Sequence, residues 1–201
     1  DYRRAEGELQ EDAYSAFTGA LTETRRAGGA TSDVGLFVEN DWTSGPLVLT
    51  GGLRLDRTRI GKGFYIARTR DRALVTEELT PSRTDWTLSW RAGATYALDE
   101  QLRLRAAAYR GLRLPTLNEL LRPFVVFPVV TQANAALENE RLVGFEAGVD
   151  WTPVAGVEFA LTAFDNRVKG AIANVTIGPD LRQRQNLPAI DARGIEAGLR
   201  L

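Results

Sequence analysis

The sequence contains no cysteine and no histidine among its 201 residues. Without cysteine, the chain can form neither disulfide bonds nor thiolate metal sites. Without histidine, it lacks the commonest general base and the commonest transition-metal ligand, so a Ser-His-Asp triad and a histidine-ligated zinc or iron site are both excluded. We find no catalytic constellation among the remaining residues. We therefore predict that the protein is not an enzyme and that it uses no metal and no cofactor.

Methionine and long apolar runs are also absent. The chain has no start methionine, and no basic-then-apolar signal peptide opens it, so we interpret it as a piece of a longer protein. No apolar run reaches the ~18 residues that suggest a membrane-spanning helix, but strands that cross a membrane give a much weaker signal. The 25 basic and 26 acidic residues are interspersed and give a net charge of −1. This balance argues against nucleic acid as a partner.

Alternation of apolar and polar residues with a period of two is the dominant pattern of the chain. Residues 85–98, DWTLSWRAGATYAL, place Trp86, Leu88 and Trp90 on one face and charged or small residues on the other. Most of the segments with this pattern are near the ~9–11 residues that a tilted strand needs to cross a bilayer. We predict an all-β, antiparallel fold with about eight such strands, at residues 1–9, 33–42, 46–58, 85–98, 101–110, 142–152, 156–167 and 192–201.

The connections between these strands alternate strictly between short and long. Short turns are expected around residues 43–45, 99–100 and 153–156, and long loops near 10–32, 59–84, 111–141 and 168–191. Outer-membrane barrels have short turns on the periplasmic side and long loops outside. The apolar face also carries almost no charge in mid-strand, as lipid contact requires. Both features favour a transmembrane β-barrel over the alternative of a soluble β-sandwich binding module.

Five blocks of the sequence resemble, in order, blocks of the barrel of TonB-dependent outer-membrane receptors. They are VGLFVENDW (34–42), LVLTGGLRLDR (47–57), LRLRAAAYRGLRLPTLNELLRPF (102–124), ANAALENERLVGFEAGVDW (133–151) and QNLPAIDARGIEAGLRL (185–201). Asn139 and Leu112 stand where the family usually has proline and phenylalanine. The positions that match the family's motifs are Arg113, Pro115, Asn118, Glu119, Asn134, Leu137, Glu140, Glu146, Asn186, Gly194 and Glu196.

The resemblance implies that residues 1–201 are part of a barrel of about 22 strands that encloses a plug. Such a receptor lies in the bacterial outer membrane, contacts its lipid, and imports a scarce nutrient such as a ferric siderophore or cobalamin. It draws energy through TonB, which would contact the plug region that these residues do not contain. The alternative is a small self-contained eight-stranded outer-membrane barrel with a structural or adhesive role, since eight strands can close.

The segment 109–124, YRGLRLPTLNELLRPF, is the main candidate site. Arg110, Arg113 and Arg122 would suit an anionic cargo. The other interpretation, which we favour, is that Arg113 and its neighbours fix the strand exit and tie the loop to the barrel wall or plug. We expect an amphipathic half-turn at Leu117–Leu121, a loop turn at RIGKGFY (59–65), and a run at 124–130 that either packs on neighbouring loops or covers the ligand.

Overall fold

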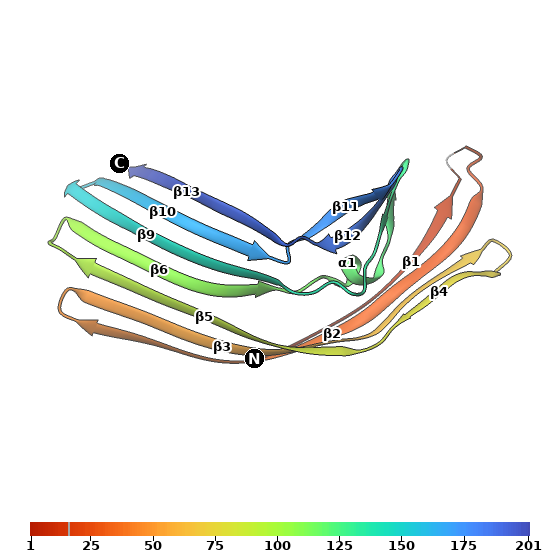
Figure 1. The fold of residues 1–201 in the computed structure, drawn as a ribbon, viewed down its shortest axis with the longest axis horizontal. Helices are drawn as coiled ribbons and strands as arrows, with labels where there is room; N and C mark the ends of the chain where they lie inside the picture. Colours follow the sequence, from red (N-terminus) through yellow and green to blue (C-terminus); the bar gives the residue numbers. More distant parts are fainter. Residues whose placement is uncertain (16) are drawn as a thin grey trace.

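The structure, a computed structural model, describes residues 1–15 and 17–201, and its main element is one large antiparallel sheet (Figure 1). The eight long strands of this sheet confirm the predicted strand number and direction. Within the described residues the two edge strands do not pair with each other, so the sheet is open. In sheet order the strands are β1 (Tyr2–Tyr14), β2 (Leu21–Ser44), β3 (Leu47–Thr69), β5 (Arg83–Ala97), β6 (Leu102–Arg113), β9 (Glu140–Val154), β10 (Val157–Lys169) and β13 (Ala189–Arg200).

Short and long connections lie at opposite ends of the sheet (Figure 1). The tight turns follow β2, β5 and β9, and two of them contain glycines with positive φ, Gly45 at 56° and Gly156 at 85°. The long connections hold a short helix, α1 (Leu117–Leu121), and the strand β4 (Leu74–Thr80), which pairs with β3. They also hold a second, four-stranded sheet of β11 (Ile172–Gly178), β12 (Leu181–Asn186), β8 (Val129–Gln132) and β7 (Phe124–Val126). The predicted half-turn is therefore confirmed as α1.

No helix in the described part of the chain has both the length and the apolar character needed to cross a membrane.

The segments 10–32 and 59–84 differ from the predicted loops because most of their residues are strand. The ladder between β2 and β3 runs on through these segments, from Ser44↔Leu47 to Glu23↔Thr69. Gly61 and Gly63 suggested a loop turn, but they flank Lys62, whose φ is 56°, at a register shift in the ladder. The glycines thus accommodate a β-bulge, which bends a strand without ending it.

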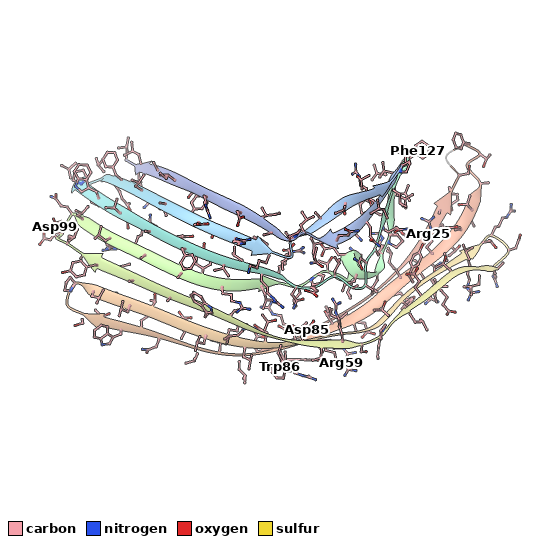
Figure 2. The ribbon with its side chains drawn as sticks, in the orientation of Figure 1. Arg25, Arg59, Asp85, Trp86, Asp99 and Phe127 are labelled. Carbon is pink, nitrogen blue, oxygen red and sulfur yellow. The ribbon has the colours of Figure 1, made fainter. Side chains whose placement is uncertain are left out.

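The two faces of the main sheet differ in chemistry as the alternation predicts. The face of the sheet opposite α1, which we call the outer face, carries uncovered apolar side chains, including Leu36 at 72% exposed and Ile195 at 73%. The face that carries α1 is the inner face. Figure 2 shows that Trp86 lies on the same side of the sheet as Arg59, away from Asp85. The inner face carries ion pairs in mid-strand. These are Arg54 with Asp56, Arg91 with Glu39, and Arg105 with Asp150.

The border between apolar and charged residues runs obliquely across the outer face. On β3 the last apolar residue is Leu55, before Arg57, whereas on β10 it is Ala163, before Asp165. Relative to one row of paired residues, this border shifts by six residues along the strands over four interstrand steps. Six residues along a strand and four steps between strands each correspond to about 20 Å. The border therefore makes an angle of about 45° with the rows of paired residues. The row is Leu53, Trp90, Arg110, Val143 and Arg167.

The apolar stretch on β5 gives the height of the outer band. From Tyr96 to Trp86 every outer residue is apolar or aromatic, and the ten residue steps between them span about 34 Å of strand. At a tilt of about 45°, this length corresponds to a band about 24 Å tall. Trp42 on β2 and Trp151 on β9 lie at the border near the short turns. The outer face therefore carries an apolar band between two oblique borders.

The buried core is small and lies on the inner face beneath α1. It consists of Ile60, Leu120, Leu121 and Leu137, of which Leu137 is fully buried. Gly29 of β2 allows α1 to approach closely, because a Cβ at Gly29 would lie 2.7 Å from the Leu121 side chain. The core therefore holds α1 against the sheet at the point where β6 ends.

Candidate functional site

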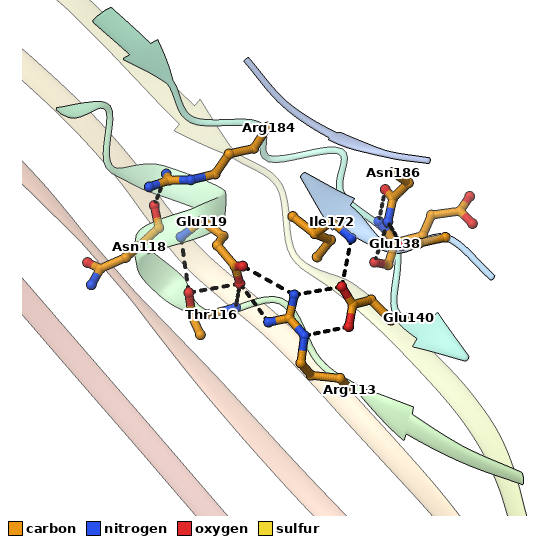
Figure 3. Close-up of polar contacts among 10 residues, drawn as sticks. Arg113, Thr116, Asn118, Glu119, Glu138, Glu140, Ile172, Arg184 and Asn186 are labelled. Atoms are coloured by element: carbon orange, nitrogen blue, oxygen red, sulfur yellow. Dashed lines mark hydrogen bonds and ion pairs between the residues drawn. The ribbon is translucent and has the colours of Figure 1, made fainter. Parts of the chain in front are cut away.

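Arg113, the last residue of β6, bridges two carboxylates from different segments (Figure 3). Its Nε and Nη2 donate to Glu140 at 2.6 and 2.8 Å, and its Nη1 and Nη2 donate to Glu119 at 3.1 and 3.2 Å. Glu140 begins β9 and also accepts a 2.6 Å hydrogen bond from the Ile172 backbone N–H. Arg113 thus joins the end of β6 to α1, and Glu140 joins the start of β9 to β11.

The residues after Arg113 explain why a helix starts there. The buried Pro115 precedes Thr116, which is the N-cap of α1. The Thr116 hydroxyl accepts from the Glu119 backbone N–H at 3.2 Å, and Glu119 accepts from the Thr116 backbone N–H at 2.8 Å. This reciprocal pair is a capping box, which satisfies two donors at the helix start. Glu119 therefore stabilises α1 and pairs with Arg113 at the same time.

The charges of this cluster stabilise one another. Hydrogen bonds to Glu140 and Glu119 raise the pKa of the Arg113 guanidinium above its ordinary value. Hydrogen bonds from Arg113 and from the Ile172 N–H lower the pKa of Glu140, against the opposing effect of partial burial. Partial burial alone would raise the pKa of Glu119, but hydrogen bonds from Arg113 and Thr116 reverse this and lower it. All three groups are therefore charged near neutral pH.

Two asparagines extend these connections to the segment that follows the helix. Asn134 donates from its side chain to the Arg184 carbonyl at 2.9 Å, and its backbone N–H donates to the Glu119 carbonyl at 3.1 Å. Asn186 donates to the carbonyls of Glu138 and Gly170 at 3.0 and 2.6 Å, and its side-chain oxygen accepts from the Glu138 N–H at 2.9 Å. Both asparagines thus tie the 133–139 segment to β12 or to its flanks.

Two further arginines complete this cluster, and the sequence motifs did not single them out. Arg184 of β12 donates to the Asn118 and Arg122 carbonyls at 2.6 and 2.8 Å, and its guanidinium lies 5.0 Å from the Phe124 ring centroid. Desolvation by burial lowers the pKa of Arg184. Arg83, at the start of β5, donates to the carbonyls of Ala135, at 3.1 Å, and Leu137. Because their partners are backbone carbonyls, no pattern of side chains in the sequence could reveal these contacts.

We name this cluster the strand-exit junction, and its residues are given at the end of this paragraph. It joins the ends of β5 and β6 and the start of β9 to α1, β11 and β12. It contains eight of the eleven residues that the motif comparison selected, among them the buried Pro115 and Asn118, which contributes its carbonyl. Its residues are Arg83, Arg113, Pro115, Thr116, Asn118, Glu119, Asn134, Leu137, Glu140, Arg184 and Asn186.

The three arginines considered for ligand binding do not converge on one site. Arg113 already bonds two carboxylates, and Arg122 pairs with Glu11 of β1. Arg110 faces the other side of the sheet, because it pairs in the ladder with Trp90 and alternates with Arg113 along β6. Ligand contact by these three residues stays a prediction, and their placement favours anchoring for Arg113 and Arg122.

The other motif residues lie on the strands below the junction. Glu146 of β9 faces inward and accepts a 2.6 Å hydrogen bond from the Tyr109 hydroxyl. Gly194 of β13 leaves room for the Phe164 ring, which a Cβ there would approach to 2.7 Å. Glu196 lies opposite Thr162 in the ladder between β13 and β10. These residues form the inner wall and are separate from the junction.

The tip of the 111–141 segment forms a hairpin of β7 and β8, with β8 also pairing parallel to β12. Phe127 in its turn is 70% exposed and makes an edge-to-face contact with Phe17, at 6.3 Å between ring centroids. The run 124–130 thus packs on neighbouring segments, while covering of a ligand stays a prediction. No group of three or more acidic residues able to hold a metal ion is present in residues 1–15 and 17–201.

Comparison with known proteins gives a family match over the whole chain. Residues 1–201 match the family described as TonB dependent receptor-like, beta-barrel. No curated protein matches the sequence significantly. The match covers all the elements described above, including the junction.

Solved structures of low sequence identity share the fold. The hemophore receptor HasR of Serratia marcescens, solved with its hemophore HasA and heme, aligns with 98% of this chain at 19% identity and a TM-score of 0.70. The ferric yersiniabactin uptake receptor FyuA of Yersinia pestis aligns with 98% at 13% identity and a TM-score of 0.72. The FrpB iron transporter of Neisseria meningitidis aligns with 98% at 18% identity and a TM-score of 0.55. The chain spans 39%, 28% and 32% of those proteins, respectively.

Proposed function

The chain belongs to the TonB-dependent receptor β-barrel family, and on that premise we propose that it forms part of the wall of an outer-membrane receptor that imports a scarce nutrient. Its eight main strands would contribute about a third of a barrel of roughly 22 strands. The receptor would take energy from TonB through a plug region outside these residues. The chain itself would supply lipid contact, lumen wall and the bases of the loops.

The oblique apolar band of the outer face is the observation that carries this proposal. Strands of membrane barrels tilt by about 35–45°, and their apolar band is about 25 Å tall. The border angle of about 45° and the band height of about 24 Å agree with both values, although they come only from residue pairing and strand geometry. A flat membrane that crosses tilted strands explains why the border lies six residues lower on β10 than on β3, relative to the row of paired residues.

The long connections would lie outside the cell and the tight turns in the periplasm. In this orientation the strand-exit junction lies above the lipid, where β6 leaves the membrane. Its many hydrogen bonds to backbone support a role in fixing the loop bases. We propose that Arg113, Glu119 and Glu140 anchor the segments 114–139 and 170–188, so that residues at the loop tips can contact the cargo.

The structural neighbours suggest, by analogy, what the cargo of this receptor is. The names of HasR and FyuA refer to heme and to ferric yersiniabactin. We propose a ferric siderophore or a similar iron-bearing compound as the cargo, with cobalamin as the second candidate. Arg110, Arg113 and Arg122 stay the candidate ligand-contacting residues, at lower priority than their structural roles. The open sheet and the family match do not favour a self-contained eight-stranded barrel.

Uptake by cells that produce the whole receptor tests this proposal. Cells starved of iron and lacking their other receptors should accumulate radioactive iron from a panel of siderophores only when the receptor gene and TonB are both present. Cobalamin uptake is measured in parallel as the second candidate. A receptor whose loss changes uptake of no compound in the panel would contradict nutrient import. A chain that is extracted from cells without detergent would contradict the membrane placement itself.

A further inference from the structure

A cluster of basic side chains lies on the outer face where the apolar band ends. Arg110 of β6, Arg141 of β9, and Arg167 and Lys169 of β10 share this face on three adjacent strands. Arg141 and Lys169 are exposed and stand directly opposite each other in the ladder. We name these four residues the basic rim cluster.

The basic rim cluster is only partly neutralised, because Asp165 on the same face of β10 pairs with Arg193 rather than with a member of the cluster. Arg167 lies 3.5 Å from Asp191, and within the described residues no other member makes an ion pair. Like charges directly opposite in a sheet repel each other, because their Cβ atoms are only about 4.5–5.5 Å apart. The Arg141–Lys169 pair therefore destabilises the bare sheet. A bound anion between the two side chains would remove this cost, which makes an anionic ligand the simplest explanation of the pair.

The opposite border of the apolar band shows no such charge. There the outer face ends, within the described residues, in Leu102, Trp151, Phe159 and Leu199, with no lysine or arginine among them. The basic side chains are therefore confined to the border on the long-connection side. Arg57 continues them along β3, with its guanidinium 6.0 Å from the Trp86 ring (Figure 2 labels Trp86 and the nearby Arg59). This asymmetry indicates a partner present in only one leaflet.

Position along the strand identifies the chemistry of that partner. Long basic side chains at the edge of an apolar band extend toward the headgroup layer while their stems contact lipid chains. The anions at that depth are the phosphates of lipid headgroups, held next to the apolar band by their acyl chains. We propose that the basic rim cluster binds the phosphate groups of an anionic outer-leaflet lipid. The proposal depends on the membrane placement above but not on the cargo.

Lipid titration of the purified whole receptor in a neutral detergent tests the site. The probe is diphosphoryl lipid A, compared with its fully dephosphorylated form. We expect the triple variant Arg110→Gln, Arg141→Gln, Lys169→Gln to bind diphosphoryl lipid A roughly 100-fold more weakly, since each basic residue near an anionic surface contributes about fivefold in affinity. The matched control is Lys62→Gln, Arg70→Gln, Arg182→Gln, which removes equal charge from exposed residues away from the band and should bind within a factor of two of the unchanged receptor.

Three results would overturn the proposal. They are unchanged binding by the triple variant, equal binding of dephosphorylated lipid, and displacement of the lipid by millimolar inorganic phosphate, which would indicate a site for free anions. If the triple variant fails to fold, the salt dependence of the unchanged receptor decides instead. Lipid binding should then weaken at least tenfold between low and high salt, and salt-independent binding would refute the site. Nutrient uptake and detergent dependence, measured separately, show whether the membrane placement survives either result.

Discussion

Arg113 and Glu140 form a two-point ion pair, with Nε 2.6 Å from Oε2 and Nη2 2.8 Å from Oε1, across the ladder between β6 and β9. A planar guanidinium matches a carboxylate in this way, and lysine cannot. Because Arg113 also reaches Glu119, one side chain couples the last pair of the ladder to the first helix beyond it. The pair therefore marks the point where the sheet gives way to packed connecting segments.

Loss of the Arg113 guanidinium should loosen the segment 114–139. We expect Arg113→Ala to cost about 1–2 kcal/mol locally, the value of charge-assisted hydrogen bonds reduced for the partial exposure of this side chain. Proteolysis of that segment in the folded receptor should then be roughly 5- to 30-fold faster. Arg113→Lys should recover only part of the loss, and Arg182→Ala, at an exposed site, should have no effect. Equal cleavage rates in Arg113→Ala and the unchanged receptor would contradict the anchoring role.

Acid should weaken the same junction. The pKa values of Glu119 and Glu140 are lowered from the ordinary 4.5, so the unfolded segment takes up protons before the folded one does. The stabilisation is therefore complete above about pH 4.5 and is lost as the pH falls through the lower folded values. Hydrogen exchange of residues 114–139, corrected for the intrinsic rate, should show increasing opening in that range. The double variant Glu119→Gln, Glu140→Gln should be less protected at neutral pH and nearly independent of acid; a response like that of the unchanged receptor would assign the effect to other groups.

Gly29 should tolerate no side chain. A Cβ there would lie 2.7 Å from Leu121 in the buried core and 3.4 Å from Leu117. We expect Gly29→Ala to destabilise the packing of α1 by about 1–3 kcal/mol, the usual cost of overpacking. Gly51→Ala is the matched control, because no atom lies within 4 Å of a Cβ at Gly51. Thermal unfolding of the two variants should differ clearly, and a Gly29→Ala receptor as stable as Gly51→Ala would show that α1 is not tightly packed.

Adjacent alanines on β6 should respond in opposite ways to a charge. Ala106 lies on the outer face near the middle of the apolar band, and Ala107 lies on the inner face opposite Glu146. We expect Ala106→Arg to cost about 2–4 kcal/mol of folding free energy in a bilayer. Ala107→Arg can pair with Glu146 and should cost much less. Folding yields in lipid vesicles measure the difference; equal yields would mean that the outer face does not contact lipid.

Alternation along the chain predicted the eight main strands and their faces, and the lengths of the connections predicted the end of the sheet at which each lies. It did not predict β4, β7, β8, β11 and β12, which lie in segments expected to be long loops. It also placed α1, since Leu117–Leu121 breaks the period of two. It did not predict how far the strands extend, because glycines at 61 and 63 signal a turn and a β-bulge equally well. It did not reveal Arg83 and Arg184, whose partners are carbonyls brought close only by the tertiary fold.

Arg110 illustrates a different limit. It was grouped with Arg113 because the two are close in sequence, yet residues three apart on a strand face opposite sides. The same alternation that predicted the strand could have separated them. Eight of the eleven residues selected by motif matching lie in the junction, and their functional role stays a prediction. Many of their contacts, however, depend on pairing between segments that are distant in sequence, such as Arg113 with Glu140, which are 27 residues apart.

The oblique border of the apolar band bears on strand register. A slip of two residues in one strand keeps every side chain on its original face, so the contrast between lumen and lipid cannot detect it. In a tilted barrel the same slip changes depth by about 5 Å. Slipped in the unfavourable direction, β6 would carry Arg110 into hydrocarbon, at a cost approaching 2–4 kcal/mol. Because a slipped strand places a charged side chain in hydrocarbon, the bilayer thickness disfavours misaligned strand pairs during assembly.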